Sequence, residues 1–347
     1  MRITYVLPLP ELNGGNKVIY QHVDLLGESG AEVTVLCEGP KPDWIRSAAA
    51  YVDYTQGPPK LPSQDLVIAT FWTTLRIARS LALGPLAHFC QGYEGGLIHL
   101  RPMLQEIEEV YSWKVPTLTV APHLGELLRE RFGRESRTVS PPLDPLFRPA
   151  WRLGPRKRPW IAIPGIVEAE VKGIPTALEA VRRLRAGGIP CRVFRFSILP
   201  LSKEEKNLLE PDRYLCGVLP PVIAEALRGC DLLFLPSQAE EGFGLPLLEA
   251  MASKVPAVAS RIPSTVYLTD GKVPLVPPGD AAAFADAARE LLSSRSAWRR
   301  AREAGYEASR RFEPAAVASQ LAEAIRWASE RAQEPLPAAS LPMEIKL

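Results

Sequence analysis

Short apolar runs recur along the chain, and stretches with apolar residues at helical spacing separate them. A strand buried on both faces of a parallel sheet shows no alternation, so each run predicts such a strand. Repeated strand-then-helix order is typical of a doubly wound parallel sheet, and therefore of an α/β fold. The expected strands are residues 3–7, 32–37, 65–70, 87–90, 117–120, 137–139, 160–163, 191–196, 214–217, 231–237 and 255–260.

The length of 347 residues suggests two domains of ordinary size. A proline- and arginine-rich stretch at 149–155 reads as the linker between them. The sequence thus predicts a first domain at 1–150 and a second at 151–313. A helical pattern follows at 314–332, and we expect the tail, 333–347, to be poorly ordered.

The most informative segment is 241–252, which lies between two expected strands and combines a glycine-containing turn with a helical pattern. We expect the helix to begin near Gly244 with Pro246 in its first turn, where the missing N–H costs nothing. The amides of residues 243–245 would then point outward and favour an anion such as phosphate. Glycine in the turn lets such a ligand approach the backbone closely.

Two carboxylates, Glu241 and Glu249, bracket this turn and are separated by seven residues. Because a phosphate would repel them, their expected partners are sugar or ribose hydroxyls. Two glutamates at this spacing could also be solvated charges beside a helix, but the strand–turn–helix setting favours a binding site.

The segment resembles the signature of the retaining family-4 glycosyltransferases of the GT-B fold, the group 1 glycosyl transferases. The resemblance implies two Rossmann-like doubly wound domains that face an interdomain cleft. The acceptor side lies on the first domain, the nucleotide sugar on the second, and the last helix returns to the first. It further implies that Glu241 contacts the transferred sugar and Glu249 the ribose. Sugar and diphosphate would lie against the turn Gly242, Phe243, Gly244 and Leu245.

A cationic side chain for the diphosphate is expected at Lys172, which precedes Gly173 and follows the strand at 160–163. The family has G-R-x5-K-G here, and its arginine and lysine bind the donor diphosphate. Lys172 fits this pattern, but Ile166 stands at the arginine position. Either Arg195 or Arg261 is a candidate to replace that cation. On the residues alone, Lys172 could also be a solvated loop lysine.

Two further donor-side features rest on the resemblance. Gly14 and Gly15 open a helix after the first strand, as in the family's amino-terminal glycine loop, which lies over the donor phosphates. Without that context a Gly-Gly turn is often only a chain reversal. Gly217 and Val218 lie in a segment similar to the family's base-binding segment.

The acceptor-side candidates are Gln91, Tyr93 and Glu94, which follow the strand at 87–90. They are similar to the Q-D-Y-E segment of bacterial rhamnosyltransferase-like members, with Gly92 in place of the aspartate. No histidine stands where many relatives have one in the active site. The alternative is a polar loop at a strand end.

Composition agrees with a globular enzyme, with 46% hydrophobic and 23% charged residues. The net charge of +2 is too small to indicate nucleic-acid binding. Five scattered cysteines without C-x-x-C spacing predict a reducing, cytoplasmic compartment and no structural zinc. The chain begins with a strand, and no apolar segment predicts a signal peptide or a membrane span.

We therefore expect a metal-independent, hexosyltransferase-like enzyme that moves a sugar from a nucleoside diphosphate sugar to an unidentified glycan, lipid-linked or small-molecule acceptor. No D-x-D or histidine–carboxylate cluster predicts a metal, and no cofactor is expected. Lipid-linked acceptors in the family also allow a weak peripheral contact with the inner face of the membrane. The alternatives are a non-catalytic GT-B protein that binds a sugar nucleotide or a partner, and an NAD-dependent oxidoreductase, which the absence of G-x-G-x-x-G disfavours.

Overall fold

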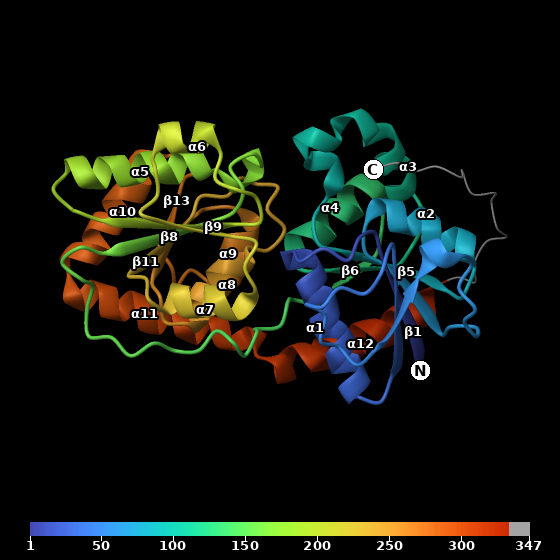
Figure 1. Cartoon of the computed structure of the whole chain (residues 1–347). Helices are drawn as coiled ribbons and strands as arrows, with labels where there is room; N and C mark the ends of the chain where they lie inside the picture. Colours follow the sequence, from blue (N-terminus) through green and yellow to red (C-terminus); the bar gives the residue numbers. More distant parts are fainter. Residues whose placement is uncertain (333–347) are drawn as a thin grey trace. The chain divides into compact units, whose positions relative to one another are not determined.

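The computed structural model describes residues 1–332, which form two compact units (Figure 1). Unit 2 comprises Leu143–Glu313, and the remaining described residues form unit 1. The boundary after Pro142 lies before the linker at 149–155 because the intervening residues are hydrogen-bonded within unit 2. Leu143 N–H donates to Phe312 O at 2.6 Å, and Ala150 N–H donates to Ser253 O at 3.1 Å. The expected tail, 333–347, lies outside the described residues.

Unit 1 is a seven-stranded parallel sheet in the order β3-β2-β1-β4-β5-β6-β7. Helices α1 and α12 pack together on one face, and α2 and α3 pack together on the other (Figure 1). The strands are β1 (Arg2–Leu7), β2 (Glu32–Cys37), β3 (Ala50–Asp53), β4 (Leu66–Ala69), β5 (Leu86–Cys90), β6 (Thr117–Thr119) and β7 (Ser136–Thr138); the helices are α1 (Gly14–Glu28), α2 (Trp72–Leu81), α3 (Leu104–Tyr111), α4 (Pro122–Phe132) and α12 (Pro314–Arg331).

Unit 2 is a six-stranded parallel sheet in the order β10-β9-β8-β11-β12-β13. Helices α5 and α10 cover one face, and α7, α8, α9 and α11 cover the other (Figure 1). The strands are β8 (Trp160–Pro164), β9 (Arg192–Ser197), β10 (Arg213–Cys216), β11 (Leu232–Leu235), β12 (Ala257–Ser260) and β13 (Leu275–Val276); the helices are α5 (Ile174–Ala186), α6 (Lys203–Leu208), α7 (Pro220–Arg228), α8 (Leu245–Ala252), α9 (Pro263–Thr269), α10 (Ala281–Ser293) and α11 (Arg295–Ser309).

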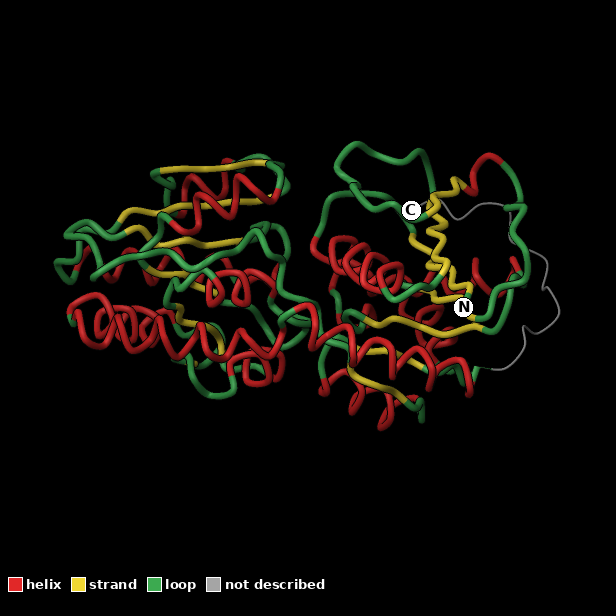
Figure 2. The backbone as a smooth tube through the Cα atoms, turned by 90° about the horizontal axis from the view of Figure 1, so that it is seen from below, coloured by secondary structure: helices red, strands yellow, loops and turns green. Residues whose placement is uncertain are grey.

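Two sheet strands lie outside the predicted set. All four residues of a central strand such as β4 are buried, which is why its sequence is continuously apolar. By contrast, β3 is an edge strand whose residues are half-buried or exposed, and β13 is a two-residue edge strand. Neither presents the apolar run on which the prediction depended. Between β7 and β8 the chain forms no helix or strand and is drawn as green loop in Figure 2.

Each sheet has one point where the strand order reverses. In unit 2 the chain runs outward from β8 through β9 to β10, and then returns to place β11 on the other side of β8. In unit 1 the same reversal lies between β1 and β4. Ligands of open α/β sheets bind outside the carboxyl ends of the strands at such points. The loops after β8 and β11 are therefore the place to seek a site in unit 2.

Candidate functional site

The loops after β8 and β11 are held against each other by backbone contacts. Gln238 N–H donates to Val171 O at 2.8 Å. Gly173 has φ +59°, and a Cβ added there would lie 2.1 Å from the carbonyl oxygen of Pro236. Glycine is thus required by both the backbone conformation and the close approach. The contact brings the two sequence-predicted charged residues, far apart in the chain, to one place.

At this place Lys172 and Glu241 form an ion pair. Lys172 Nζ lies 2.8 Å from Glu241 Oε2, and the hydroxyl of Ser237 donates to the same oxygen at 2.9 Å. The Glu241 side chain is 10% exposed and that of Lys172 35% exposed. Within residues 1–332 no donor reaches Glu241 Oε1. One carboxylate oxygen is therefore fixed by the protein, and the other can accept a hydrogen bond from a ligand.

The turn that follows Glu241 leads into α8, as expected. Gly244 is the N-cap with φ +91°, a left-handed conformation that favours glycine, and Pro246 occupies the first helical turn. In the described part of the chain the amides of Gly242, Phe243, Gly244 and Leu245 have no hydrogen-bond acceptor. The Phe243 side chain is buried edge-on against Phe312, with ring centroids 5.5 Å apart. The turn thus combines an anchored side chain with free N–H groups beside a cation.

The other donor-side residues of unit 2 also lie beyond strand carboxyl ends or on α8. Glu249 is a half-buried residue of α8, within one and a half turns of its start. Gly217 follows β10, adopts φ +59° and donates its N–H to Ser197 O at 2.8 Å. Val218, the next residue, is half-buried. Because β10 is the edge strand, Gly217 and Val218 lie along the same sheet edge but away from the switch point.

The suggestion that Arg195 replaces the family's arginine is wrong. Its side chain is fully buried, and it pairs with Glu205, whose Oε1 lies 2.5 Å from Arg195 Nε. Its remaining nitrogens donate to the carbonyls of Ile163 at 2.6 Å and Gly165 at 2.8 Å. Arg195 therefore fixes the backbone at the start of the Lys172 loop and has no group for a ligand. Arg261 is exposed just after β12 and stays a candidate.

In unit 1 the structure brings Gln91 to the glycine loop. The amide nitrogen of Gln91 donates to Gly15 O at 3.2 Å, and a Cβ added at Gly15 would lie equally close to that nitrogen. Asn13 caps α1 by accepting from Asn16 N–H at 2.8 Å, while Gly14 and Gly15 form the first turn. Two predicted features that are distant in sequence therefore form one arrangement after β1 and β5.

Tyr93 and Glu94 lie in the interior of unit 1, each 7% exposed. The Tyr93 ring packs edge-on against Tyr111, whose hydroxyl donates to the Glu94 carboxylate. Burial raises the pKa of Glu94 to about 7, although hydrogen bonds from Tyr111 and from the backbone N–H of Trp72 oppose the shift. These two residues hold the loop that carries Gln91. Their place in an acceptor site stays a prediction.

Three residues that build these arrangements were not among the sequence candidates. Ser237 orients Glu241, Gly173 allows the two loops to meet, and Tyr111 binds Glu94. For Ser237 a signal existed, because it directly follows an expected strand and precedes the turn. The role of Tyr111 depends on a contact across seventeen residues, which no local pattern shows.

Solved structures with this architecture identify the fold. The chain superposes on Anabaena HepE (Alr3699) in complex with UDP-glucose with a TM-score of 0.74 at 15% identity, over 94% of this chain and 100% of that one. Sucrose-phosphate synthase from Thermosynechococcus elongatus gives 0.73 at 17% identity, over 94% and 98%. The expected GT-B fold of two Rossmann-like domains is confirmed.

Part of the second unit also resembles known sequences. Residues 158–294 match the family described as Glycosyl transferases group 1. A phosphatidyl-myo-inositol mannosyltransferase of Mycobacterium leprae is 41% identical over 123 residues, which are 35% of this chain and 33% of that protein. The matched part thus spans about a third of the relative's length. The resemblance to the group 1 glycosyl transferases is confirmed, and it is carried by unit 2. Of the helices in residues 1–332, none has the length and apolar character needed to cross a membrane.

Proposed function

We propose that the protein is a retaining glycosyltransferase that moves a hexose from a nucleoside diphosphate sugar to an acceptor. The observation that carries the proposal is the group formed by Lys172, Glu241 and the free amides of residues 242–245 at the switch point of unit 2. It combines a cation and N–H donors, which suit a diphosphate, with a carboxylate oxygen suited to a sugar hydroxyl.

The charge of each group suggests its role in the transfer. Bond cleavage between sugar and diphosphate leaves negative charge on the leaving group, and prepositioned donors that face this charge lower the barrier. Lys172 and the turn amides supply them. Glu241 orients the sugar through Oε1, since Oε2 is occupied by Lys172 and Ser237. Glu249 is assigned to the ribose, as the resemblance implies.

The names of related proteins support the donor class. HepE was solved with UDP-glucose, and the mycobacterial relative is named a mannosyltransferase. The proposal extends to a glycan or lipid-linked acceptor, to cytoplasmic action with weak peripheral contact at the inner membrane face, and to chemistry without a metal or cofactor. Across residues 1–332 no three histidine, cysteine or acidic side chains gather as a metal site would require.

Nucleotide-dependent thermal stabilisation tests the donor site. A ligand at one hundred times its dissociation constant adds about 2.7 kcal/mol to the folded state, which raises Tm by roughly 5 to 10 °C for a domain of this size. We expect one nucleoside diphosphate to stabilise the wild type and Glu240→Ala, whose exposed carboxylate is the matched control. Glu249→Ala should lose most of the shift. Equal shifts in all three proteins would refute the assignment of Glu249.

Transfer itself is measured by release of nucleoside diphosphate from the sugar nucleotide, with and without a chelator. The proposal expects release that persists in the chelator and an α-linked product from an α-linked donor. Binding without any release would favour the non-catalytic alternative. Loss of release on chelation would contradict metal independence.

A further inference from the structure

Trp151 is an unusual residue of unit 2. Its side chain is 97% exposed, and Leu153 beside it is 67% exposed. The six other tryptophans of the chain are buried or half-buried. Large apolar side chains that stand together in solvent mark an interaction surface more often than a single exposed one does.

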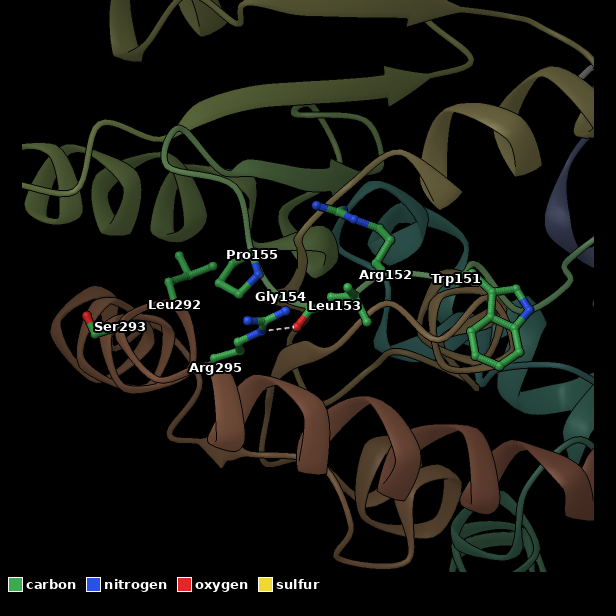
Figure 3. Close-up of a pocket in the computed structure, with 8 residues that line it drawn as sticks. All are labelled: Trp151, Arg152, Leu153, Gly154, Pro155, Leu292, Ser293 and Arg295. Atoms are coloured by element: carbon green, nitrogen blue, oxygen red, sulfur yellow. Dashed lines mark hydrogen bonds between the residues drawn. The ribbon is translucent and has the colours of Figure 1, made fainter.

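The backbone that carries Trp151 is firmly held. Arg302, itself 4% exposed, donates to the carbonyls on both sides of it, Arg152 O at 2.6 Å and Ala150 O. Arg299 Nε donates to Leu153 O at 2.9 Å, and Arg295 Nε donates to the same oxygen (Figure 3). A buried arginine and two further hydrogen bonds thus fix the segment while its two apolar side chains stay in solvent.

Positive charge lies on the same segment as these side chains and on α11, which is hydrogen-bonded to that segment. Lys157 and Arg158 continue the segment and are exposed, and Arg295, Arg299 and Arg300 are exposed at the start of α11. Arg295 is the first residue of α11, where a cation opposes the helix dipole, so its position is unfavourable for the helix alone. No carboxylate in residues 1–332 forms an ion pair with any of these five. The buried carboxylate of Asp231 forms its ion pairs with Arg152 and Arg156 instead.

This surface is separate from the donor site. It includes an open groove of about 720 Å³ lined by residues 151–155 and by the junction of α10 and α11 (Figure 3). Arg152 and Arg156 bind Asp231, which precedes β11, whereas Ser237 and Glu241 follow β11. The groove therefore lies at the amino edge of the sheet and the donor site at the carboxyl edge.

We propose that this basic edge, defined as residues 151–158 with Arg295, Arg299 and Arg300, binds an anionic lipid bilayer. Trp151 and Leu153 enter the headgroup boundary, where the amphipathic indole ring is favoured. The five cations, which have no carboxylate partner in residues 1–332, attract the lipid phosphates, and each attraction falls off within a Debye length. A fluid anionic interface fits apolar side chains that project from a fixed backbone, because it requires no shaped partner surface. The inference deepens the membrane contact of the proposed function by naming its surface.

Tryptophan fluorescence reports this binding directly, because only Trp151 is exposed. On vesicles of phosphatidylglycerol and phosphatidylcholine we expect a blue shift of emission, absent on pure phosphatidylcholine and reversed by high salt. Trp151→Phe should keep the binding, measured by sedimentation, but lose the shift. Trp151→Ala should weaken vesicle binding in the sedimentation assay about tenfold or more, because the apolar area that the indole ring buries in the bilayer is lost.

The charge variant is Lys157→Glu with Arg158→Glu, and its matched control is Lys203→Glu with Lys206→Glu on α6, which makes the same change in net charge at exposed positions. We expect about 30-fold weaker binding for the first and little change for the second. Equal effects of the two pairs, or no sedimentation of the wild type with anionic vesicles, would overturn the proposal. A surface for an acidic protein would give that second result. The vesicles contain no sugar nucleotide, so failure here leaves the donor-site test unaffected.

Discussion

Glu94 provides the sharpest test of how unit 1 is built. Its carboxyl group is buried and receives the hydroxyl of Tyr111. Burial raises its pKa from the ordinary 4.5 to about 7, so the folded state retains a proton that the unfolded state loses at lower pH. Stability from this group is fully present below pH 4.5 and is lost as pH rises through 7.

The magnitude follows from the two pKa values. Each pH unit between them changes the free energy of unfolding by about 1.4 kcal/mol, so ionised Glu94 costs about 3 kcal/mol above pH 7. Glu94→Gln keeps an acceptor for the Tyr111 hydroxyl but does not titrate. The variant should therefore gain stability over the wild type as pH rises from 5 to 8, by roughly 5 to 10 °C in Tm.

The assay is thermal unfolding of wild type and variant across this pH range, read as the difference in Tm at each pH. Glu106→Gln, at an exposed position on α3, is the control and should show a constant difference. Tyr111→Phe removes a hydrogen bond that lowers the pKa of Glu94, so the transition should move to higher pH. A Glu94→Gln profile parallel to that of the wild type would refute the reasoning.

Three further substitutions probe unit 2. Gly173→Ala should lower the free energy of unfolding, measured in urea titrations, by about 1 to 3 kcal/mol because of backbone strain and the 2.1 Å clash. Gly30 has φ +89° but no atom near the added Cβ, so Gly30→Ala should cost less. Equal costs for the two variants would count against the clash. Glu241→Gln should reduce the rate of transfer about 10- to 150-fold in nucleotide-release assays, because it removes a charge-assisted hydrogen bond to the sugar. An unchanged rate would contradict this role. Arg195→Met should lower the free energy of unfolding by about 3 to 5 kcal/mol, because it leaves the Glu205 carboxylate buried without its partner. Adding Glu205→Gln should restore much of this stability in the same assay. A double variant as unstable as the single variant would exclude this cause.

Two arginines show why local sequence cannot assign a charged residue to a role. Arg195 and Arg261 each lie at or just after the end of an apolar strand, so the local sequence does not distinguish them. In the fold Arg195 lies between three acceptors of its own protein, whereas Arg261 is exposed. Which of them can meet a ligand depends on neighbours that are distant along the chain.

The sequence by itself determined the α/β class, the central strands and the start of α8, because apolar periodicity, glycine and proline act on the backbone locally. It also placed Lys172 and Glu241 in separate segments of interest. Only the tertiary structure joined them at 2.8 Å, set Gly173 against Pro236 and enclosed Glu94. The physical reason is that burial, pKa and ion pairing depend on contacts between strands whose order in the sheet reverses, and no local pattern encodes that order.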